Sequence, residues 1–593
     1  MQKIASVIIS FIVIALVASS NLYAQDQKVA AVDWSGLWVA EKDYGPSFRG
    51  PVSLQKVEET WLVRSQGETT AAQRIINANG TTEWRFEFPG VGRFVGVQGN
   101  EDATIVGHWI QPSGQIAFYP LATPVRMHRD GKDSFIGELK PYLDKVSLNI
   151  PLFKEDDAAQ TYRTFLRNPE RNLGVYFRIG QAVADTSHIR FMHENGNELS
   201  AATVIEPGER FLLEFSRTGE TLEFTKRDRH EAPGFFPRRY PAPASTMTRP
   251  VETDDQWQTT SPTAAGLSQE PLLTMINELA AFEPTALRQP YIHSLLIAHK
   301  GKLVVDEYFH GYSRDDTHDS RSSGKSLASA LLGIGIHEGI VESIDQPIYP
   351  LMGGVNAFAN PDPRKTELSF RHLITMSSGL DCDDGDQDSP GNEDVMQTQQ
   401  AQSDWYRYAL DLALIRDPGV AGVYCTAGIN LVGGALAKAA DMSLMQFFEQ
   451  KFAQPLSIRH YEMNLSPTEQ AYMGGGIQLR PRDFLKLGQL YLDKGEWHGQ
   501  RLLSEDFVTA SAAAQASIND PDDYGYAWWR HRFDVDGRAV ETFYASGNGG
   551  QMLFVVPELE LVVLFQAGNY SDGRTRREYR DRLMQQHILP AAL

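Results

Sequence analysis

The stretch RSSGKSLASALLGIGIH, residues 321–337, is the most informative segment of the chain. Ser322 and Lys325 lie three residues apart, just ahead of the apolar run Leu327 to His337, which has helical periodicity. Three residues make nearly one helical turn, so the two side chains are expected to share a face. A serine hydroxyl is a poor nucleophile near neutral pH, and a lysine desolvated by burial can act as the base that it needs. The segment therefore predicts a helix whose first turn carries a nucleophilic serine.

A serine and a lysine at this spacing are a weak signal when they stand alone. Ordinary composition yields roughly one such pair by chance in a chain of this size. A second copy, Ser53 to Lys56, lies in a β-rich part of the sequence. That copy has no companion motif, and we interpret it as accidental.

Two companion segments follow the Ser322 motif in the chain. In GVYCTAG, residues 422–428, Tyr424 ends a loop before an apolar helix, and in ASGNGGQ, residues 545–551, a glycine-rich turn opens an apolar strand. In this order the three segments resemble the motifs of the penicilloyl serine transferase superfamily. That superfamily contains class C β-lactamases, penicillin-binding DD-peptidases and family VIII esterases. Within it, the sequence is most similar to the 6-aminohexanoate-dimer hydrolase branch.

The resemblance extends beyond these motifs and covers about Asp254 to Leu593. It includes LITMSSGL at 373–380, GGGIQLRPRD at 474–483 and YGYAWW at 524–529. Trp528 and Trp529 of the last segment could line the acyl pocket or lie in the core.

The resemblance implies a role for each reactive residue. Ser322 is the implied nucleophile, Lys325 its proton acceptor or relay, and Tyr424 the base that protonates the leaving group and later activates water. The side chains of Lys325 and Tyr424 should titrate as a coupled pair rather than as two independent groups. The backbone N–H groups of Ser322 and Gln551 would hold the oxyanion. The residues implied in substrate binding are Thr426, Asn548, Gly549 and Gly550.

Two departures from the family pattern affect the expected substrate. Many relatives have asparagine at the place of Thr426, and Lys-Thr-Gly or His-Thr-Gly where Asn548 to Gly550 stands. The cation that would bind a β-lactam or peptide carboxylate is therefore missing. This favours uncharged esters or amides, although Arg321 could substitute for that cation.

The first half of the chain predicts an all-β fold. From Trp34 to Arg227, short runs rich in β-branched and aromatic residues are separated by Gly, Asn and Asp turns. We predict a lipocalin-like barrel or a meander, with a sandwich as the alternative. A barrel that encloses an apolar ligand is a further hypothesis for this half. The clearest expected strands are 61–64, 82–88, 104–109 and 115–119.

A proline-rich connector divides the chain. Six prolines lie between residues 233 and 262, which is typical of an extended linker. The predicted organisation is a leader at 1–24, a β-rich domain at 25–232, the linker at 233–262 and a β-lactamase-like α/β domain at 263–593. In the last domain, helices are expected at 272–282, 327–337, 427–440 and 481–491. Strands at both ends of it should form one antiparallel sheet around an inserted helical region.

The N-terminus has the pattern of a secretory signal. Lys3 precedes the apolar run Ile4 to Ala18, and Ala24 is a small residue at a suitable cleavage position. The run is shorter than the ~20 apolar residues that span a bilayer. We therefore expect a periplasmic or secreted protein without stable membrane insertion after cleavage.

The two cysteines, Cys382 and Cys425, are expected to form a disulfide in an exported chain, with two buried thiols as the alternative. A bridge would hold the Tyr424 loop in place. The acidic run from Asp381 to Asp386 lacks the bidentate glutamate of a calcium loop, and we interpret it as a solvated loop. No metal and no cofactor are expected.

The composition limits the partners. The chain has 593 residues, 75 acidic against 55 basic, and a formal net charge of −20, which would repel a phosphate backbone. Nucleic acid is therefore not an expected partner. The sequence predicts a serine hydrolase that cleaves a small ester or amide through an acyl-enzyme. The alternatives are a D-amino-acid peptidase or β-lactam-recognising protein, and a non-catalytic binding protein on the same fold.

Overall fold

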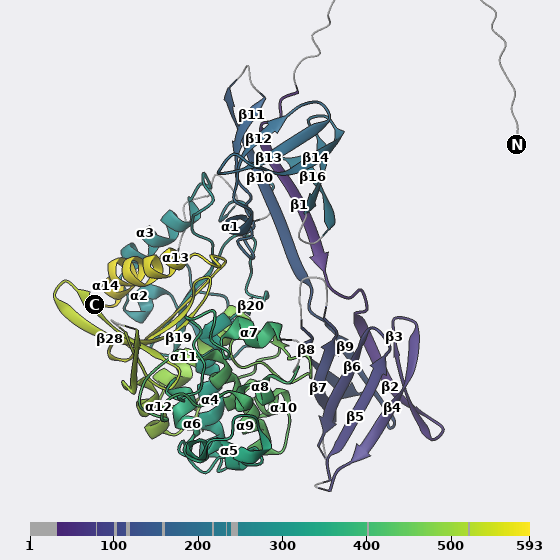
Figure 1. The fold of residues 1–593 in the computed structure, drawn as a ribbon, viewed down its shortest axis with the longest axis vertical. Coiled ribbons are helices and arrows are strands. Elements are labelled where there is room, and N and C mark those ends of the chain that lie inside the picture. Colours follow the sequence, from purple (N-terminus) through teal and green to yellow (C-terminus); the bar gives the residue numbers. More distant parts are fainter. Residues whose placement is uncertain are drawn as a thin grey trace, which may run out of the picture.

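The computed structural model describes residues 32–78, 80–99, 103–113, 119–156, 160–215, 219–232, 234–238, 247–399, 403–519 and 522–593. The expected leader at 1–24 lies outside the described residues, as does the strand expected at 115–119 apart from its last residue. The chain forms two β-barrels, in purple and blue in Figure 1, and a C-terminal domain of helices and sheet, in teal to yellow. None of the helices within the described ranges is long and apolar enough to span a bilayer.

The first barrel is closed and has antiparallel neighbours throughout. Its interior is filled by side chains: Trp34 and Trp38 pack with their ring centroids 5.3 Å apart, and Phe211 lies 5.0 Å from Trp38. Its strands are β1 (Gly36–Tyr44), β10 (Asp144–Asp156), β11 (Thr161–Thr164), β12 (Ile179–Ala184), β13 (His188–His193), β14 (Glu198–Glu206), β15 (Arg210–Phe215) and β16 (Glu220–Arg227).

A second barrel is inserted between β1 and β10. It closes because β9 pairs with both β2 and β8, and tryptophan and phenylalanine side chains such as Trp84 and Trp109 fill its interior. Its strands are β2 (Gly50–Val57), β3 (Thr60–Ser65), β4 (Glu68–Ile76), β5 (Thr82–Phe88), β6 (Gly92–Gln98), β7 (Thr104–Gln111), β8 (Leu121–Arg129) and β9 (Ser134–Leu139). The predicted all-β barrel is thus confirmed, but the chain forms two barrels where one was expected.

One nine-stranded sheet organises the C-terminal domain, in the order β17-β19-β18-β30-β29-β28-β27-β26-β25. Strand β18 comes from the beginning of the domain and β30 from its end. The two strands pair antiparallel, which confirms a sheet built from both ends of the domain. Only the two-residue pairing of β17 with β19 is parallel among the described strands. The strands are β17 (Gln258–Thr259), β18 (Ile292–His299), β19 (Lys302–Tyr308), β25 (Ala516–Asn519), β26 (Asp522–Tyr524), β27 (Trp529–Val535), β28 (Arg538–Gly547), β29 (Gln551–Val556) and β30 (Leu561–Ala567).

Helices cover both faces of this sheet. All eight residues of β18 are buried. Leu295 and Ile297 pack on the side of the sheet that α3 (Gln269–Ala280) and the C-terminal helical segment cover. Leu296 and Ala298 pack on the opposite side, which α4 (Lys325–His337) covers. The four predicted long helices are confirmed as α3, α4, α9 (Thr426–Ala440) and α11 (Pro481–Leu492).

Shorter elements complete the chain. They are the α-helices α1 (Gly174–Phe177), α2 (Pro262–Ala265), α5 (Ile348–Leu351), α6 (Phe370–Ile374), α7 (Glu393–Thr398), α8 (Trp405–Asp411), α10 (Leu444–Phe448), α12 (Glu505–Ala512), α13 (Gly573–Arg577) and α14 (Leu589–Ala592). The π-helices are η4 (Glu449–Ala453) and η6 (Glu578–Ile588), and the 3-10 turns are η1 (Arg321–Gly324), η2 (Val355–Ala357), η3 (Pro363–Glu367) and η5 (Pro557–Leu559). The strands are β20 (His318–Asp319), β21 (Tyr461–Asn464), β22 (Ile477–Leu479), β23 (Glu496–Trp497) and β24 (Gln500–Arg501).

The second barrel is joined to the C-terminal domain by backbone pairing. Strand β21 pairs with β8, so that β20, β22 and β21 extend the barrel sheet to eleven strands. Next to this pairing, Tyr461 of β21 donates a hydrogen bond to Glu449 and lies 2.7 Å from the ring nitrogen Nε2 of His108 in the barrel. Arg126 of β8 forms an ion pair with the same Glu449. The two parts therefore share a buried polar network, and Figure 1 shows β7 and β8 alongside the helices of the domain.

Buried histidines, of which His108 lies at this junction, should make the folded protein sensitive to acid. Burial lowers the pKa of His108 to about 3, with a contribution from Arg126. Away from the junction, beside the Gly234 carbonyl, burial likewise lowers the pKa of His310 to about 3. Both are therefore neutral in the folded protein at a pH where the unfolded chain, with a pKa of ~6.5, binds a proton. The free energy of unfolding should fall between pH 6.5 and 3, by up to ~1.4 kcal/mol per pH unit for each histidine.

The measurement is urea unfolding between pH 7.5 and 4.5, with the His108→Gln variant as the control. The variant should show a shallower loss of unfolding free energy than the wild type. Equal slopes would mean that His108 takes up its proton without opening the junction.

Candidate active site

The Ser322 motif folds as a tight turn that leads into α4. Ser322 lies in the turn η1, and Lys325 is the first residue of α4, so both side chains project to the same side. The Lys325 ammonium donates to Ser322 Oγ at 2.9 Å and to the Gly474 carbonyl at 2.6 Å. Lys325 is 1% exposed. The serine hydroxyl thus has a buried amine as its direct neighbour.

Close packing and a hydrogen bond hold this turn in a strained conformation. Arg321, just before the serine, has a φ of 48°, a conformation that a side chain of this kind rarely adopts. Ser320 donates its hydroxyl to the Ile477 carbonyl at 2.7 Å. On the other side, a Cβ added to Gly547 would come within 2.6 Å of the Ser320 carbonyl oxygen, so only glycine permits β28 to approach this closely.

Tyr424 belongs to the loop that precedes α9, and its ring lies beside the Lys325 side chain. The Lys325 Nζ is 5.2 Å from the centre of the Tyr424 ring, and the ring stacks on Trp529 at 5.9 Å. Backbone bonds fix the loop: Val423 N–H donates to the Met376 carbonyl at 2.7 Å, and Asp384 N–H donates to the Tyr424 carbonyl at 3.0 Å. The structure therefore brings Ser322 and Lys325 of one segment together with Tyr424 of another.

The expected disulfide joins Cys382 to Cys425, with Cα atoms 5.5 Å apart. It ties the residue after Tyr424 to the acidic loop. In that loop, the Asp384 carboxylate accepts hydrogen bonds from the Thr426 amide at 2.8 Å and the Thr426 hydroxyl at 2.5 Å. The sequence did not suggest this structural role for Asp384. Thr426 itself is fully buried.

Removal of this bridge should destabilise the protein. Cross-linking residues 43 positions apart lowers the entropy of the unfolded chain, so the Cys382→Ala/Cys425→Ala variant should lose about 2–4 kcal/mol of unfolding free energy. Because the bridge adjoins Tyr424, kcat should fall too. Thermal melting with and without reductant tests this: reductant should lower the Tm of the wild type and leave that of the variant unchanged, whereas equal responses would contradict the prediction.

A cleft of about 720 Å³ opens on Ser322. Tyr424 and Trp529 form part of its wall, whereas Trp528 is fully buried against Tyr491 and Phe543 in the core. Of the residues expected to bind substrate, three line the cleft: Asn548, Gly549 and Gly550. Gln551 is fully buried next to this turn, and its side-chain amide donates to the Ala567 carbonyl at 2.6 Å.

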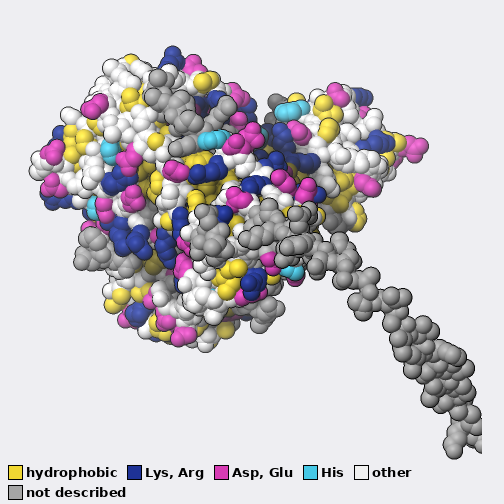
Figure 2. All heavy atoms as spheres, turned by 90° about the horizontal axis from the view of Figure 1, so that it is seen from above, with side chains coloured by type: hydrophobic (Ala, Val, Ile, Leu, Met, Phe, Trp, Pro, Cys, Tyr) yellow, Lys and Arg dark blue, Asp and Glu magenta, His cyan; other side chains and the backbone are white. Residues whose placement is uncertain are grey.

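Carboxylates outnumber arginines around the cleft. Burial raises the pKa of Asp522, but hydrogen bonds from His531 and Tyr544 and the charge of Arg580 outweigh it, so the pKa lies below its ordinary value. The other charged lining residues are Asp383, Asp384, Asp572 and Arg577. Arg321, the expected substitute cation, forms an ion pair with Asp319 at 2.8 Å. On the face shown in Figure 2, acidic and basic side chains are interspersed.

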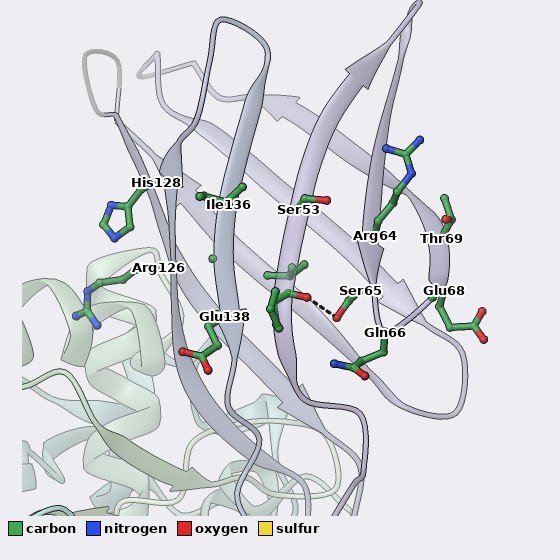
Figure 3. Close-up of a pocket in the computed structure, with 14 residues that line it drawn as sticks. Ser53, Arg64, Ser65, Gln66, Glu68, Thr69, Arg126, His128, Ile136 and Glu138 are labelled. Carbon is green, nitrogen blue, oxygen red and sulfur yellow. Dashed lines mark hydrogen bonds between the residues drawn. The ribbon is translucent and has the colours of Figure 1, made fainter.

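A larger hollow, of about 870 Å³, lies far from this constellation on the outside of the second barrel (Figure 3). Ser53 is on its wall, but Lys56 is three positions along the same strand, where alternate side chains point to opposite faces. Lys56 forms an ion pair with Glu59 at 3.5 Å. The second Ser-x-x-Lys copy therefore does not form a site.

Comparisons with known proteins found one family model, a curated relative and several solved structures that are similar to this chain. The Beta-lactamase family model matches residues 293–586. The chain is 23% identical over 393 residues to the 6-aminohexanoate-dimer hydrolase of Paenarthrobacter ureafaciens, covering 58% of this chain and 93% of that protein. Among solved structures, EstCE1, a hydrolase with promiscuous acyltransferase activity, is 17% identical with a TM-score of 0.42, covering 57% of this chain and 99% of its own. A family VIII carboxylesterase is 16% identical with a TM-score of 0.40, covering 51% and 92%.

The family model includes the Ser322 turn, the Tyr424 loop and the glycine turn at Asn548. The part of this chain from residue 293 to 586 is therefore similar to the Beta-lactamase family, and the curated relative that it matches is a hydrolase.

Proposed function

We propose that this protein is an exported hydrolase that cleaves a small ester or amide through a covalent acyl-enzyme on Ser322. The observation that carries the proposal is the 2.9 Å contact between Ser322 Oγ and Nζ of the buried Lys325, whose unprotonated amine would serve as the base. A nucleophile and a base within hydrogen-bonding reach are what acyl transfer requires.

In the acylation step, Ser322 Oγ attacks the substrate carbonyl carbon and forms the new C–O bond. The hydroxyl proton passes to the Lys325–Tyr424 pair. The bond from the carbonyl carbon to the leaving oxygen or nitrogen then breaks, and Tyr424 delivers a proton to the leaving group. The negative oxygen formed in between is held by the N–H of Ser322 and a second backbone N–H at the glycine turn, for which we propose Gln551.

Deacylation repeats the sequence with water. Tyr424 accepts a proton from the attacking water, the ester bond to Ser322 Oγ breaks, and the proton returns to the serine. The products are a carboxylic acid and the free enzyme, so the kinetics should be ping-pong. No metal or cofactor takes part in these steps.

The charges of the cleft favour an uncharged substrate. Asp383, Asp384 and Asp572 line it, and the charge of Arg580 is already balanced by Asp522 at 2.7 Å. A free carboxylate close to Ser322 would meet net negative charge. We therefore propose neutral esters or amides before β-lactams and peptides with a C-terminal carboxylate.

Export is part of the proposal. The Cys382–Cys425 bridge supports it, because disulfides persist in oxidising compartments. Expression of the full chain in a bacterium with a periplasm should give a mature protein that begins at Gln25. A cytoplasmic protein that retains Met1 would contradict export.

Intact-mass analysis after exposure to a fluorophosphonate tests the proposed function. The wild type should gain the mass of one adduct, and the Ser322→Ala variant should gain none. If neither folded protein is labelled and no ester is hydrolysed, the chain is a binding protein on a hydrolase fold.

A further inference from the structure

A segment of the N-terminal half packs directly against the end of β30 in the C-terminal domain. Residues 165–178 link β11 to β12 of the first barrel and contain α1, and we call them the α1 segment. Figure 1 shows α1 at the end of the first barrel that faces the C-terminal domain. A Cβ added to Gly568 would come within 1.9 Å of the Pro169 carbonyl oxygen, so glycine is needed for the two backbones to approach this closely.

Two hydrogen bonds join the α1 segment to the loop 569–571. The Asn172 side-chain amide donates to the Tyr570 carbonyl at 3.0 Å, and this bond is buried. The Tyr176 hydroxyl lies 2.6 Å from Ser571 Oγ at the surface. Asn172 has a φ of 53°, in the left-handed region that asparagine adopts more readily than most residues. The loop 569–571 is therefore held by the N-terminal half of the chain.

The same loop holds the glycine turn at Asn548. The Asn569 N–H donates to the Gly549 carbonyl at 3.0 Å, and the Ser571 N–H donates to Asn548 Oδ1 at 3.0 Å. The Tyr570 ring packs on this turn, because a Cβ added to Gly549 would come within 2.9 Å of it. The loop thus connects the α1 segment to the glycine turn.

Tyr570 also contacts the turn that carries the nucleophile. The guanidinium carbon of Arg321 lies 5.0 Å from the centre of the Tyr570 ring, and Arg321 immediately precedes Ser322. In the same region, a cavity of about 390 Å³ reaches Ser322 and Asn548. Its wall includes three residues of the N-terminal half, Tyr142, Asp144 and Arg171. The N-terminal half therefore borders the active site where the glycine turn and the Ser322 turn meet.

We propose that Asn172 is a positioning residue of this hydrolase: through Tyr570, it holds the glycine turn in the place where that turn stabilises the negative oxygen. This inference rests on the proposed function, in which a backbone N–H at the turn and the N–H of Ser322 hold that oxygen. Donors aimed at a developing charge are effective only when they are held in place before the reaction. The N-terminal half is then part of the catalytic unit.

The test replaces Asn172 by glycine in the full-length protein. Glycine keeps the left-handed backbone conformation without strain and removes only the side chain that donates to Tyr570. With p-nitrophenyl butyrate as substrate, kcat/KM should fall about tenfold, less than the roughly 10²–10³-fold loss that follows complete removal of an oxyanion donor. The turn stays in place but is less well fixed.

Two ketones separate the glycine turn from the rest of the site. Ser322 Oγ adds to the carbonyl carbon of trifluoromethyl propyl ketone, and the adduct carries a negative oxygen at the position of the oxyanion. Methyl propyl ketone has the same propyl group but is too weak an electrophile to form this adduct. In Asn172→Gly, the inhibition constant of the trifluoromethyl ketone should rise about tenfold, in step with the loss of kcat/KM. The inhibition constant of methyl propyl ketone should not change.

Asn360→Gly is the matched control. Asn360 also has a positive φ, of 50°, and its side-chain amide donates to the Asp411 carbonyl at 2.9 Å, away from the residues that line the cleft. This variant should keep the wild-type kcat/KM. Should Asn172→Gly fail to fold, Tyr176→Phe removes one exposed hydroxyl next to Ser571 and should lower kcat/KM about threefold.

A folded Asn172→Gly protein with a kcat/KM within about twofold of the wild type would overturn the inference. Equal losses of affinity for the two ketones would also overturn it, because Asn172 would then affect the whole site and not the glycine turn. Failure of the proposed function looks different, because the wild type would then leave p-nitrophenyl butyrate intact and Ser322 would not react with a fluorophosphonate.

Discussion

Replacing Ser322 by alanine should lower kcat/KM for ester hydrolysis on the order of 10⁴-fold or more. The variant lacks the atom that forms the acyl-enzyme, and the remaining groups can only bind substrate and polarise its carbonyl. The Lys325 ammonium keeps its bond to the Gly474 carbonyl at 2.6 Å, so we expect the site to stay folded around the missing hydroxyl. Initial rates with p-nitrophenyl butyrate measure the loss.

The neighbouring Ser323 provides the matched control. It is fully buried and donates to the Ser320 carbonyl at 2.5 Å, away from Lys325. Ser323→Ala should therefore retain most of the activity. A Ser322→Ala protein that still turns over the ester at a rate within tenfold of the wild type would show that another residue is the nucleophile.

Replacing Lys325 by methionine should reduce kcat/KM by about 10³–10⁴-fold, because the serine loses its only amine neighbour among the described residues within hydrogen-bonding distance. Methionine fills the same narrow space with an apolar chain. The loss should lie mainly in kcat, and fluorophosphonate labelling of Ser322 should slow in parallel. Stopped-flow measurement of the burst and steady state separates acylation from deacylation.

Lys365 offers a control for the burial of a lysine. It is fully buried and donates to the Leu412 carbonyl at 2.7 Å, in a part of the domain that does not line the cleft. Lys365→Met should lower the Tm without a comparable loss of kcat in the folded protein. Equal losses of kcat in both variants would mean that Lys325 acts by stabilising the fold alone.

The sequence by itself determined the local elements. Alternation in TEWRFEF, residues 82–88, predicted a strand that β5 reproduces, and helical periodicity placed α4, α9 and α11 within two residues of their ends. These patterns are local, because side chains on one face of a helix or strand recur every few residues. The Ser322–Lys325 contact follows from the same local geometry.

Only the tertiary structure decided how the β-rich half is closed and where it lies. Strand alternation does not specify a partner, so it could not reveal that β2–β9 close on themselves and interrupt the first barrel between β1 and β10. Nor could the strand pattern tell that Trp528 is buried in the core whereas Trp529 lines the cleft, because two adjacent tryptophans differ only in their tertiary surroundings. The wall of Tyr142, Asp144 and Arg171 near Ser322 joins residues about 150–180 positions apart, and no local pattern encodes contacts over that separation. The sequence thus set the chemistry of the serine, whereas the packing of the barrels against the domain set the shape of the space around it.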